Sequence, residues 1–466
     1  MKRALLLAVV LAAWVRPLEA DLPGYDDAYY ARKALEVVRS GEWLALPFNG
    51  APTFDNPPLG IWTQAIMFQL FGASDAAARF PAGLYGVLAV IMAYAWAHQR
   101  FGSRETAFLC AAILLCNPLF LKYLRRGMLD MGLLFWCLAG VWLAERKPLS
   151  RTMHVLSGMA FGLAYLTKSF LALSVFAALV LGWMIGGPEG LGRLRHWVLP
   201  AVGGFTIVAG SWISAMIWLY GEAFLRGHFV WLVWEEGIRG ISDTGRAETL
   251  LRVLLVLLPA SAIFIAALGL ALRRTSEGRY RWAELSVPLT WGFIALLTPQ
   301  VVGPRKLWYF LVALPGIAAA GAAAVSIWTR ERPRLELRLV KGTIVVWSLA
   351  LAAVLILPLP LHRDRTEAVR ALAGELRART DESTPVSLYF PAGGCRWDVR
   401  NAFLWYADRQ ILSCAGERES LTRTDEASRR WILTSLDGLE QLRSGTRELL
   451  LWSSRGDLAL VTLERL

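Results

Sequence analysis

The chain has 466 residues, of which 56% are hydrophobic and only 18% are charged, and its mean hydropathy is +0.43. Because soluble globular proteins carry charge on roughly a quarter of their residues, this composition excludes an ordinary soluble protein, a disordered chain and a collagen-like one. The formal net charge of +12 does not indicate a nucleic-acid partner, since Lys and Arg gather in short clusters between apolar runs, where they orient membrane helices.

Apolar runs of about 20 residues recur from the N-terminus to about residue 360 and predict about eleven transmembrane helices in a mainly α protein. The first run, which begins at Met1, is either a cleaved signal peptide or an uncleaved first helix. We favour the helix, because multispanning proteins commonly begin this way. The further spans are expected at 77–97, 105–121, 129–144, 154–168, 170–187, 197–219, 250–272, 284–298, 307–328 and 340–360.

Basic clusters fall on alternate connections between these runs. By the positive-inside rule these connections and the Met1 end are cytoplasmic, so the other connections and the segment after His362 face outward. Two outward loops, residues 20–60 and 220–249, are long, and long loops on one face are expected to build the functional site. The expected transmembrane domain is residues 1–361.

Residues 362–466 carry charge at ordinary soluble density and predict a small outward α/β domain. Its expected elements are one helix and four strands, at 365–379, 385–390, 431–436 and a strand pair within 448–463. Cys395 and Cys414 lie in this domain, and in an oxidising compartment they could form a disulfide. Spacing alone leaves that question open.

The first outward loop contains adjacent carboxylates, Asp26 and Asp27, flanked by tyrosines that include Tyr30. Carboxylates just outside a membrane helix can serve as a general base or as metal ligands. The alternative is that one of the two caps the helix expected to begin around Ala28. Asp55 is a third outward carboxylate in this loop, ahead of an apolar helix expected along the membrane interface.

Other outward connections carry cations. Arg125 and Arg126 share a short turn with Asp130, which predicts either an Arg–Asp pair or a clamp for phosphate. Lys168 interrupts an apolar run, so it either snorkels to the interface or meets an anion. The loop at 231–240 holds Glu236 among indoles; it is either part of the site or an interfacial aromatic belt with solvated charges.

The outward end of another expected helix carries Arg305, Lys306 and Tyr309. All these elements gather on one side of the membrane: carboxylates that can act as a base, cations that can hold phosphate, and aromatic rings that can stack on a sugar. The pattern is typical of a site for chemistry on a lipid-linked phosphate.

The order of these motifs resembles the GT-C glycosyltransferases. Within them it is similar to the branch that contains the lipid A 4-amino-4-deoxy-L-arabinose transferases and the bacterial relatives of protein O-mannosyltransferases. The resemblance covers roughly residues 1–330 and rests on Asp-Asp-x-x-Tyr-Ala, Phe-Asp-Asn-Pro-Pro-x-Gly-x-Trp, Met-Leu-Asp, Leu-Thr-Lys-Ser-Phe, Trp-Glu-Glu and Arg-Lys-x-x-Tyr. An outward C-terminal α/β domain is also similar to that branch.

The resemblance implies a GT-C fold, a polyprenyl-phosphate sugar donor, a lipid, glycan or protein acceptor, and transfer at the periplasmic face of a bacterial inner membrane. It implies that Asp26 is the catalytic base and that Asp27 occupies the acidic position beside it. The donor phosphate would then be held by Lys168, Arg305, Lys306, Tyr309 and Arg125, with Asp130 and Tyr30 as support.

Three positions depart from the aminoarabinose transferases: Asn56 replaces a phosphate-binding lysine, Gly237 a histidine and Tyr29 an arginine. The sugar and the acceptor are therefore not fixed. The loss of the histidine weakens a metal site, although Asp55 and Glu236 could still supply oxygen ligands to a divalent ion.

The alternatives to an enzyme are a lipid or sugar transporter or flippase, and a membrane scaffold. A transporter more often shows matched inverted halves with polar breaks near the midplane, whereas here the polar motifs gather at one face. A scaffold would not need so many charged groups on that face.

Overall fold

The fold is taken from a computed structural model of the full chain, which describes residues 21–22, 24–148, 150–238, 245–258, 260–272, 278–301, 306–329, 366–391, 394–416, 429–444 and 449–464, with single positions between 334 and 345. Of residues 232–238 only the backbone is described. The expected first span, before residue 20, and the expected last span, 340–360, lie outside this part of the chain.

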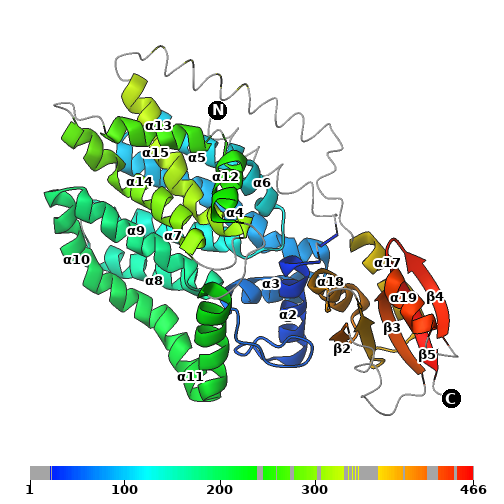
Figure 1. Ribbon diagram of the computed structural model, residues 1–466. Helices are drawn as coiled ribbons and strands as arrows, with labels where there is room; N and C mark the ends of the chain where they lie inside the picture. The colour runs from blue at the N-terminus through cyan, green and yellow to red at the C-terminus, as the bar shows by residue number, and fades with distance from the viewer. Residues whose placement is uncertain are drawn as a thin grey trace.

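A bundle of helices forms the larger part of the molecule, and a smaller α/β unit lies beside it, with α2, α3 and α18 between the two (Figure 1). The helical elements of the bundle are α2 (Asp26–Ser40), α3 (Leu59–Phe71), α4 (Asp75–Phe101), α5 (Arg104–Cys116), α6 (Pro118–Leu124), α7 (Asp130–Ala144), α8 (Arg151–Lys168), α9 (Leu171–Ile185), α10 (Pro188–Phe205), η2 (Thr206–Gly210), α11 (Ser211–Phe224), η3 (Leu225–Ile238), α12 (Arg246–Val256), α13 (Ala260–Leu272), α14 (Gly278–Val301), η4 (Leu307–Ala313) and α15 (Leu314–Thr329).

The expected number of about eleven spans is not confirmed. Among the described residues, three helices are long and apolar enough to cross a membrane: Asp75–Phe101, Pro188–Trp231 and Leu307–Thr329. The number rises to five if two bent helix pairs each count as one span.

Breaks in the helices account for part of the difference, and two of the expected spans lie outside the described residues. The expected span 105–121 is interrupted before Pro118, which has no backbone N–H, and α5 and α6 meet there at 69°. The Asn117 side chain caps the new helix by accepting from the backbone N–H of Leu119 at 2.9 Å. The expected span 250–272 is the second bent pair, with 102° between α12 and α13. Helices α7 and α9 are only 15 residues long, short of the roughly 20 that cross a bilayer.

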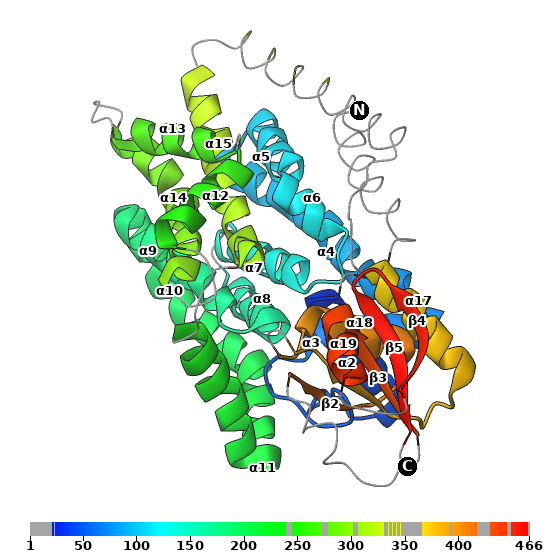
Figure 2. The same ribbon diagram turned by 45° about the vertical axis from the view of Figure 1, so that its right-hand side comes forward.

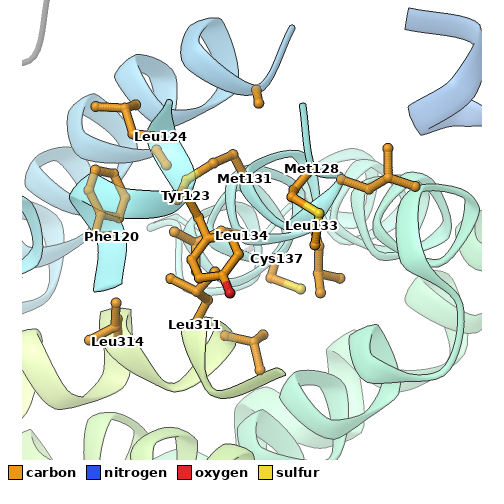
Figure 3. Close-up of a cluster of buried hydrophobic side chains, with 14 of the residues drawn as sticks. Phe120, Tyr123, Leu124, Met128, Met131, Leu133, Leu134, Cys137, Leu311 and Leu314 are labelled. Carbon is orange, nitrogen blue, oxygen red and sulfur yellow. The ribbon is translucent and has the colours of Figure 1, made fainter. Parts of the chain in front are cut away.

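Part of the core of the bundle lies where α6, α7 and η4 meet (Figure 3). There, Phe120 and Tyr123 of α6 lie against Leu134 and Cys137 of α7 and Leu311 of η4, and all five side chains are buried. Because these short elements pack directly on one another, the start of α7, which carries Asp130, and η4, which carries Tyr309, are held in a fixed arrangement.

The C-terminal unit is a five-stranded mixed sheet with helices, where the sequence predicts an α/β unit with four strands and one helix. Its strand order is β2-β1-β3-β5-β4; β1 runs parallel to β2 and β3, and β5 is antiparallel to β3 and β4. The elements are α17 (Thr366–Arg379), β1 (Val386–Tyr389), α18 (Trp397–Ala407), β2 (Ile411–Ala415), β3 (Arg429–Ser435), α19 (Leu436–Arg443), β4 (Leu449–Arg455) and β5 (Leu458–Glu464).

Three of these elements, α18, β2 and α19, were not predicted. Helix α18 does carry the signal of a buried helix face, since Val399, Ala402, Phe403 and Tyr406 recur at helical spacing and are all buried. Its shortness, 11 residues, and the polar sequence before it conceal that pattern.

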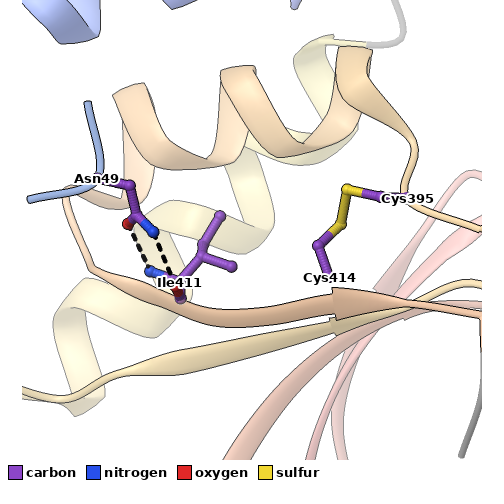
Figure 4. The surroundings of a disulfide bond; sticks show 4 residues. All are labelled: Asn49, Cys395, Ile411 and Cys414. Atoms are coloured by element: carbon purple, nitrogen blue, oxygen red, sulfur yellow. Dashed lines mark hydrogen bonds between the residues drawn. A yellow bond between two sulfur atoms is a disulfide. The ribbon is translucent and has the colours of Figure 1, made fainter. Parts of the chain in front are cut away.

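The disulfide question left open by the sequence is answered by the fold: Cys395 and Cys414 are bonded, with their Cα atoms 5.1 Å apart (Figure 4). The bridge joins the segment before α18 to strand β2. Near the same strand, the Asn49 side chain of the first outward loop donates to the carbonyl of Ile411 at 2.8 Å and accepts from its N–H at 2.9 Å.

Helix α18 packs directly on α2, so the C-terminal unit holds the segment that contains α2 in place (Figure 2). The Asp408 carboxylate, just after α18, accepts from Arg32 and Arg39 of α2 at 2.6 Å each. On the other side of the contact, Asp75 accepts from the indole of Trp405 at 2.7 Å and from the Tyr406 hydroxyl at 2.9 Å.

Candidate active site

Helix α2 begins at Asp26, so Asp26 and Asp27 lie in its first turn, where negative charge is favoured by the helix dipole. Neither residue is the N-cap: that position is Tyr25, and no side chain caps the helix. The alternative that one carboxylate is a capping group is therefore wrong.

The Asp27 side chain is fully buried, and both of its carboxylate oxygens accept hydrogen bonds. Its carboxylate accepts from the guanidinium of Arg126 at 2.5–3.1 Å and from the backbone N–H of Gly127 at 2.7 Å. This contact ties the start of α2 to the turn between α6 and α7. It also corrects the expected Arg–Asp pair, because Arg126 pairs with Asp27 and not with Asp130.

Asp26, in contrast, keeps part of its surface exposed, and among the described residues nothing donates a hydrogen bond to its carboxylate or forms an ion pair with it. Burial by the surrounding protein raises the pKa of Asp26 from 3.8 to about 6; Lys168 opposes this shift, while Asp27 adds to it. A carboxylate without a partner and with a pKa near neutrality has the properties of a general base.

Lys168 stands opposite the start of α2, at the end of α8. Its ammonium donates to Asp130 Oδ2 at 2.6 Å and lies 5.6 Å from the centre of the Tyr309 ring. The side chain is only 11% exposed, so it does not snorkel toward the interface. It meets an anion, as one of the two alternatives predicts, and that anion is the carboxylate at the start of α7.

Asp130 retains one unused acceptor: its Oδ1 is buried and, within the described part of the chain, has no hydrogen-bond partner. A buried oxygen of this kind is costly unless a ligand or a proton meets it. Tyr30, one turn after Asp26 on α2, is buried close by; burial and the charges of Asp26 and Asp130 raise the pKa of its hydroxyl, which remains protonated.

The structure thus brings together Asp26, Tyr30, Asp130, Lys168 and Tyr309 from four separate elements. The other candidates are placed differently or not placed. Lys306 is exposed beside the ring of Trp308, and Arg125 lies in the turn next to Arg126. Arg305 and the side chain of Glu236 lie outside the described residues.

The proposed metal ligand Asp55 is already satisfied. Its Oδ1 accepts from the Lys33 ammonium at 2.6 Å and its Oδ2 accepts from the Tyr29 hydroxyl at 2.8 Å. In the described part of the chain, no three His, Cys, Asp or Glu side chains form a group that could hold a metal ion. The described residues do not fit a metal site at Asp55, and the side chain of the other candidate ligand, Glu236, lies outside them.

Sequence reasoning missed Lys33 and His228. Lys33 lies seven residues after Asp26 and four after Tyr29, and this helical spacing places it along the same side of α2. His228 of η3 is buried; its Nε2 lies 3.0 Å from the Tyr165 hydroxyl and its Nδ1 lies 3.0 Å from the carbonyl of Phe54. No local pattern around His228 distinguishes it.

Three to five of the described helical segments are long and apolar enough to cross a membrane, and the fold joins to them a polar cluster from four separate elements. Residues 55–219 match the sequence profile of the dolichyl-phosphate-mannose-protein mannosyltransferase family. Among curated proteins, the chain is similar to the undecaprenyl phosphate-alpha-4-amino-4-deoxy-L-arabinose arabinosyl transferase of Edwardsiella ictaluri, with 26% identity over 319 residues, which are 66% of this chain and 56% of that protein.

Two solved structures share the fold. The crystal structure of ArnT from Cupriavidus metallidurans bound to undecaprenyl phosphate matches with a TM-score of 0.78 and 16% identity, over 99% of this chain and 97% of that one. The archaeal oligosaccharyltransferase AglB from Archaeoglobus fulgidus, in complex with an inhibitory peptide and a dolichol-phosphate, matches with a TM-score of 0.57 and 13% identity, over 94% of this chain and 69% of that one.

These findings confirm the resemblance that the motifs predict: the chain is similar to the ArnT-like GT-C glycosyltransferases in sequence, and it has their fold. The regions aligned in sequence span 35–64% of the length of the curated relatives.

Proposed function

We propose that this protein is a membrane glycosyltransferase that transfers a sugar from a polyprenyl-phosphate donor to a lipid, glycan or protein acceptor, with its site on the periplasmic face of a bacterial inner membrane. The observation that carries the proposal is the Asp26 carboxylate, which has no hydrogen-bond or ion-pair partner among the described residues and is close enough to Lys168 for that charge to act on its pKa. The relatives support the choice of donor, since ArnT is bound to undecaprenyl phosphate and AglB to a dolichol-phosphate.

In this reaction Asp26 accepts the proton of the acceptor hydroxyl as its oxygen attacks the anomeric carbon. A new C–O bond forms on the face opposite the leaving group, the bond from the anomeric carbon to the phosphate oxygen breaks, and the polyprenyl phosphate departs with its electron pair. Configuration at the anomeric carbon is therefore inverted. If the acceptor is itself a phosphate, base catalysis matters less and positioning matters more.

We infer that Lys168 and Tyr309 hold the donor phosphate. Since one face of the Lys168 ammonium is held by Asp130, its position is fixed before the donor arrives, and its other N–H groups are available for charge-assisted hydrogen bonds. Such bonds strengthen as the phosphate gains charge on leaving. Asp27 has a different task in this scheme: it holds Arg126 and thereby the start of α2.

The test is incubation of the purified protein with radiolabelled polyprenyl-phosphate sugars and a crude envelope acceptor fraction. Label moves to the acceptor with the wild type and with the control Asp381→Asn, a carboxylate exposed in the C-terminal unit, but not with Asp26→Asn. Absence of transfer from all donors by folded wild-type protein contradicts the proposal and favours a transporter; full activity of Asp26→Asn removes Asp26 as the base.

A further inference from the structure

Beside the candidate site, a buried lysine holds a group of oxygens. Lys33 has no exposed side-chain surface, and its ammonium lies 2.6 Å from Asp55 Oδ1, 2.9 Å from Asn56 Oδ1 and 4.4 Å from the centre of the Tyr29 ring. Two oxygens and an aromatic face around one positive charge form a complete small cation site. The cation in it belongs to the chain itself.

Both oxygens of Asp55 are committed within this site, because Tyr29 donates to the second one at 2.8 Å. Burial alone raises the pKa of Asp55, but the Lys33 ammonium outweighs it and the resulting pKa lies below the ordinary value. A divalent ion at Asp55 would have to displace the lysine. A displaced ammonium would then be buried beside a second positive charge, which a site of low dielectric does not tolerate.

The neighbouring side chains that could act as metal ligands also form hydrogen bonds within the protein. Glu36, the other carboxylate near Lys33 on α2, accepts from Arg32 at 2.6 Å and from the N–H groups of Asn49 and Gly50 at 2.9 Å each. The imidazole of His228, close to Asp55, has both nitrogens in hydrogen bonds, to Phe54 and to Tyr165. Both imidazole nitrogens of His228 and both carboxylate oxygens of Glu36 are therefore already held in hydrogen bonds within the protein.

We propose that the Lys33 ammonium is a built-in cation that takes the position of a divalent metal at Asp55 and Asn56, so that this site binds no metal ion and the transfer reaction needs none there. That transfer needs no metal at this site rests on the proposed function, whereas the occupation of the site by the Lys33 ammonium does not. The lysine also holds Asp55 and Tyr29 in place, through its contact with Asp55 Oδ1 at 2.6 Å and with the Tyr29 ring at 4.4 Å.

The first experiment compares metal content. Wild-type protein and Asp55→Asn are purified, dialysed against Mg²⁺, Mn²⁺ and Zn²⁺, and analysed by plasma mass spectrometry. We expect equal metal content in the two proteins. An equivalent of metal in the wild type that is lost in Asp55→Asn overturns the proposal. This readout needs no activity, so it decides the question even if the proposed transfer fails.

The second experiment removes the ammonium. Lys33→Met keeps the length of the side chain without its charge, so Asp55 is left buried without a counter-ion. We expect its melting temperature to fall by several degrees, and to recover when Mn²⁺ is added or when Asp55→Asn is combined with it. A Lys33→Met protein that melts as the wild type does, without metal, contradicts the proposal. If Lys33→Met does not fold, the double variant and the metal analysis above still decide.

The third experiment measures transfer by the wild type in the presence of a chelator. Unchanged activity is expected, and Lys33→Arg, which keeps the charge, should retain more activity than Lys33→Met. Loss of transfer that added divalent metal restores, together with wild-type metal bound through Asp55, contradicts the proposal.

Discussion

Arg126 donates to both carboxylate oxygens of Asp27 across 99 residues of sequence, and this pair separates the roles of two adjacent carboxylates. Asp27 is buried and saturated, whereas Asp26, the residue before it, has no partner among the described residues. The pair also anchors α2 to the turn that precedes Asp130. The geometry of the candidate site therefore depends on Asp27, while its chemistry depends on Asp26.

The rate of transfer should depend on the ionisation of Asp26. Because burial raises the pKa of Asp26 to about 6, the carboxylate is a base only above that pH, and kcat/KM should increase through pH 6 and level off above about pH 7. The measurement is a pH–rate profile with the labelled donor. Asp381→Asn is the control and should follow the wild-type curve. A profile that is flat between pH 5 and 8 contradicts the assignment.

Removing the charge of Asp26 should stabilise the fold. A folded-state pKa above the unfolded value of 3.8 means that the ionised form is disfavoured in the folded protein, so stability falls as the pH rises through about 6. After allowance for the partial exposure of the side chain, Asp26→Asn should gain about 1–2 kcal/mol at pH 7.5. Thermal melting in detergent checks this, and the gain should vanish near pH 4, where both side chains are neutral. A loss of stability at pH 7.5 would show that the carboxylate has a structural partner.

The Lys168–Asp130 pair should show strong coupling, since both side chains are nearly buried. Lys168→Met leaves Asp130 buried without its counter-ion and should cost about 3–5 kcal/mol, most of which the double variant Lys168→Met with Asp130→Asn recovers. Transfer should remain absent in both. The matched control is the exposed pair of Arg252 and Glu248, where Arg252→Met should change stability by less than about 1 kcal/mol. Additive effects of the two substitutions at the buried pair would contradict this expectation.

The contact between the two units should depend on Asp408. Burial raises the pKa of Asp408, but its hydrogen bonds from Arg39 and Arg32 outweigh burial and hold the pKa below 3.8. Asp408→Asn should therefore destabilise the protein by about 1–2 kcal/mol above pH 4, and the difference should shrink as the pH falls through the lowered pKa. Melting curves at pH 7 and pH 3 test this. A difference that is equally large at pH 3 would assign the effect to packing rather than to charge.

The sequence by itself determined the class of the molecule. Long apolar runs, the strand pattern after residue 380 and the ordered polar motifs predict a membrane protein with a C-terminal α/β unit and a carboxylate site in the first outward loop. Such features are local, because helical and strand periodicity and turn residues act over a few positions. The same locality explains why the expected number of spans is not confirmed among the described residues: an apolar run does not disclose the bend before Pro118.

Only the tertiary structure decided which charges meet. Asp27 forms an ion pair with Arg126 and does not cap the helix. Asp130 pairs with Lys168 and not with an arginine of its own turn. Lys33 lies beside Asp55, at the position where the sequence predicts a metal ion. The disulfide and the packing of α18 on α2 are likewise decided only by the tertiary structure. The physical reason is that a buried charge requires a partner wherever packing places one, and packing brings together residues that no local pattern connects.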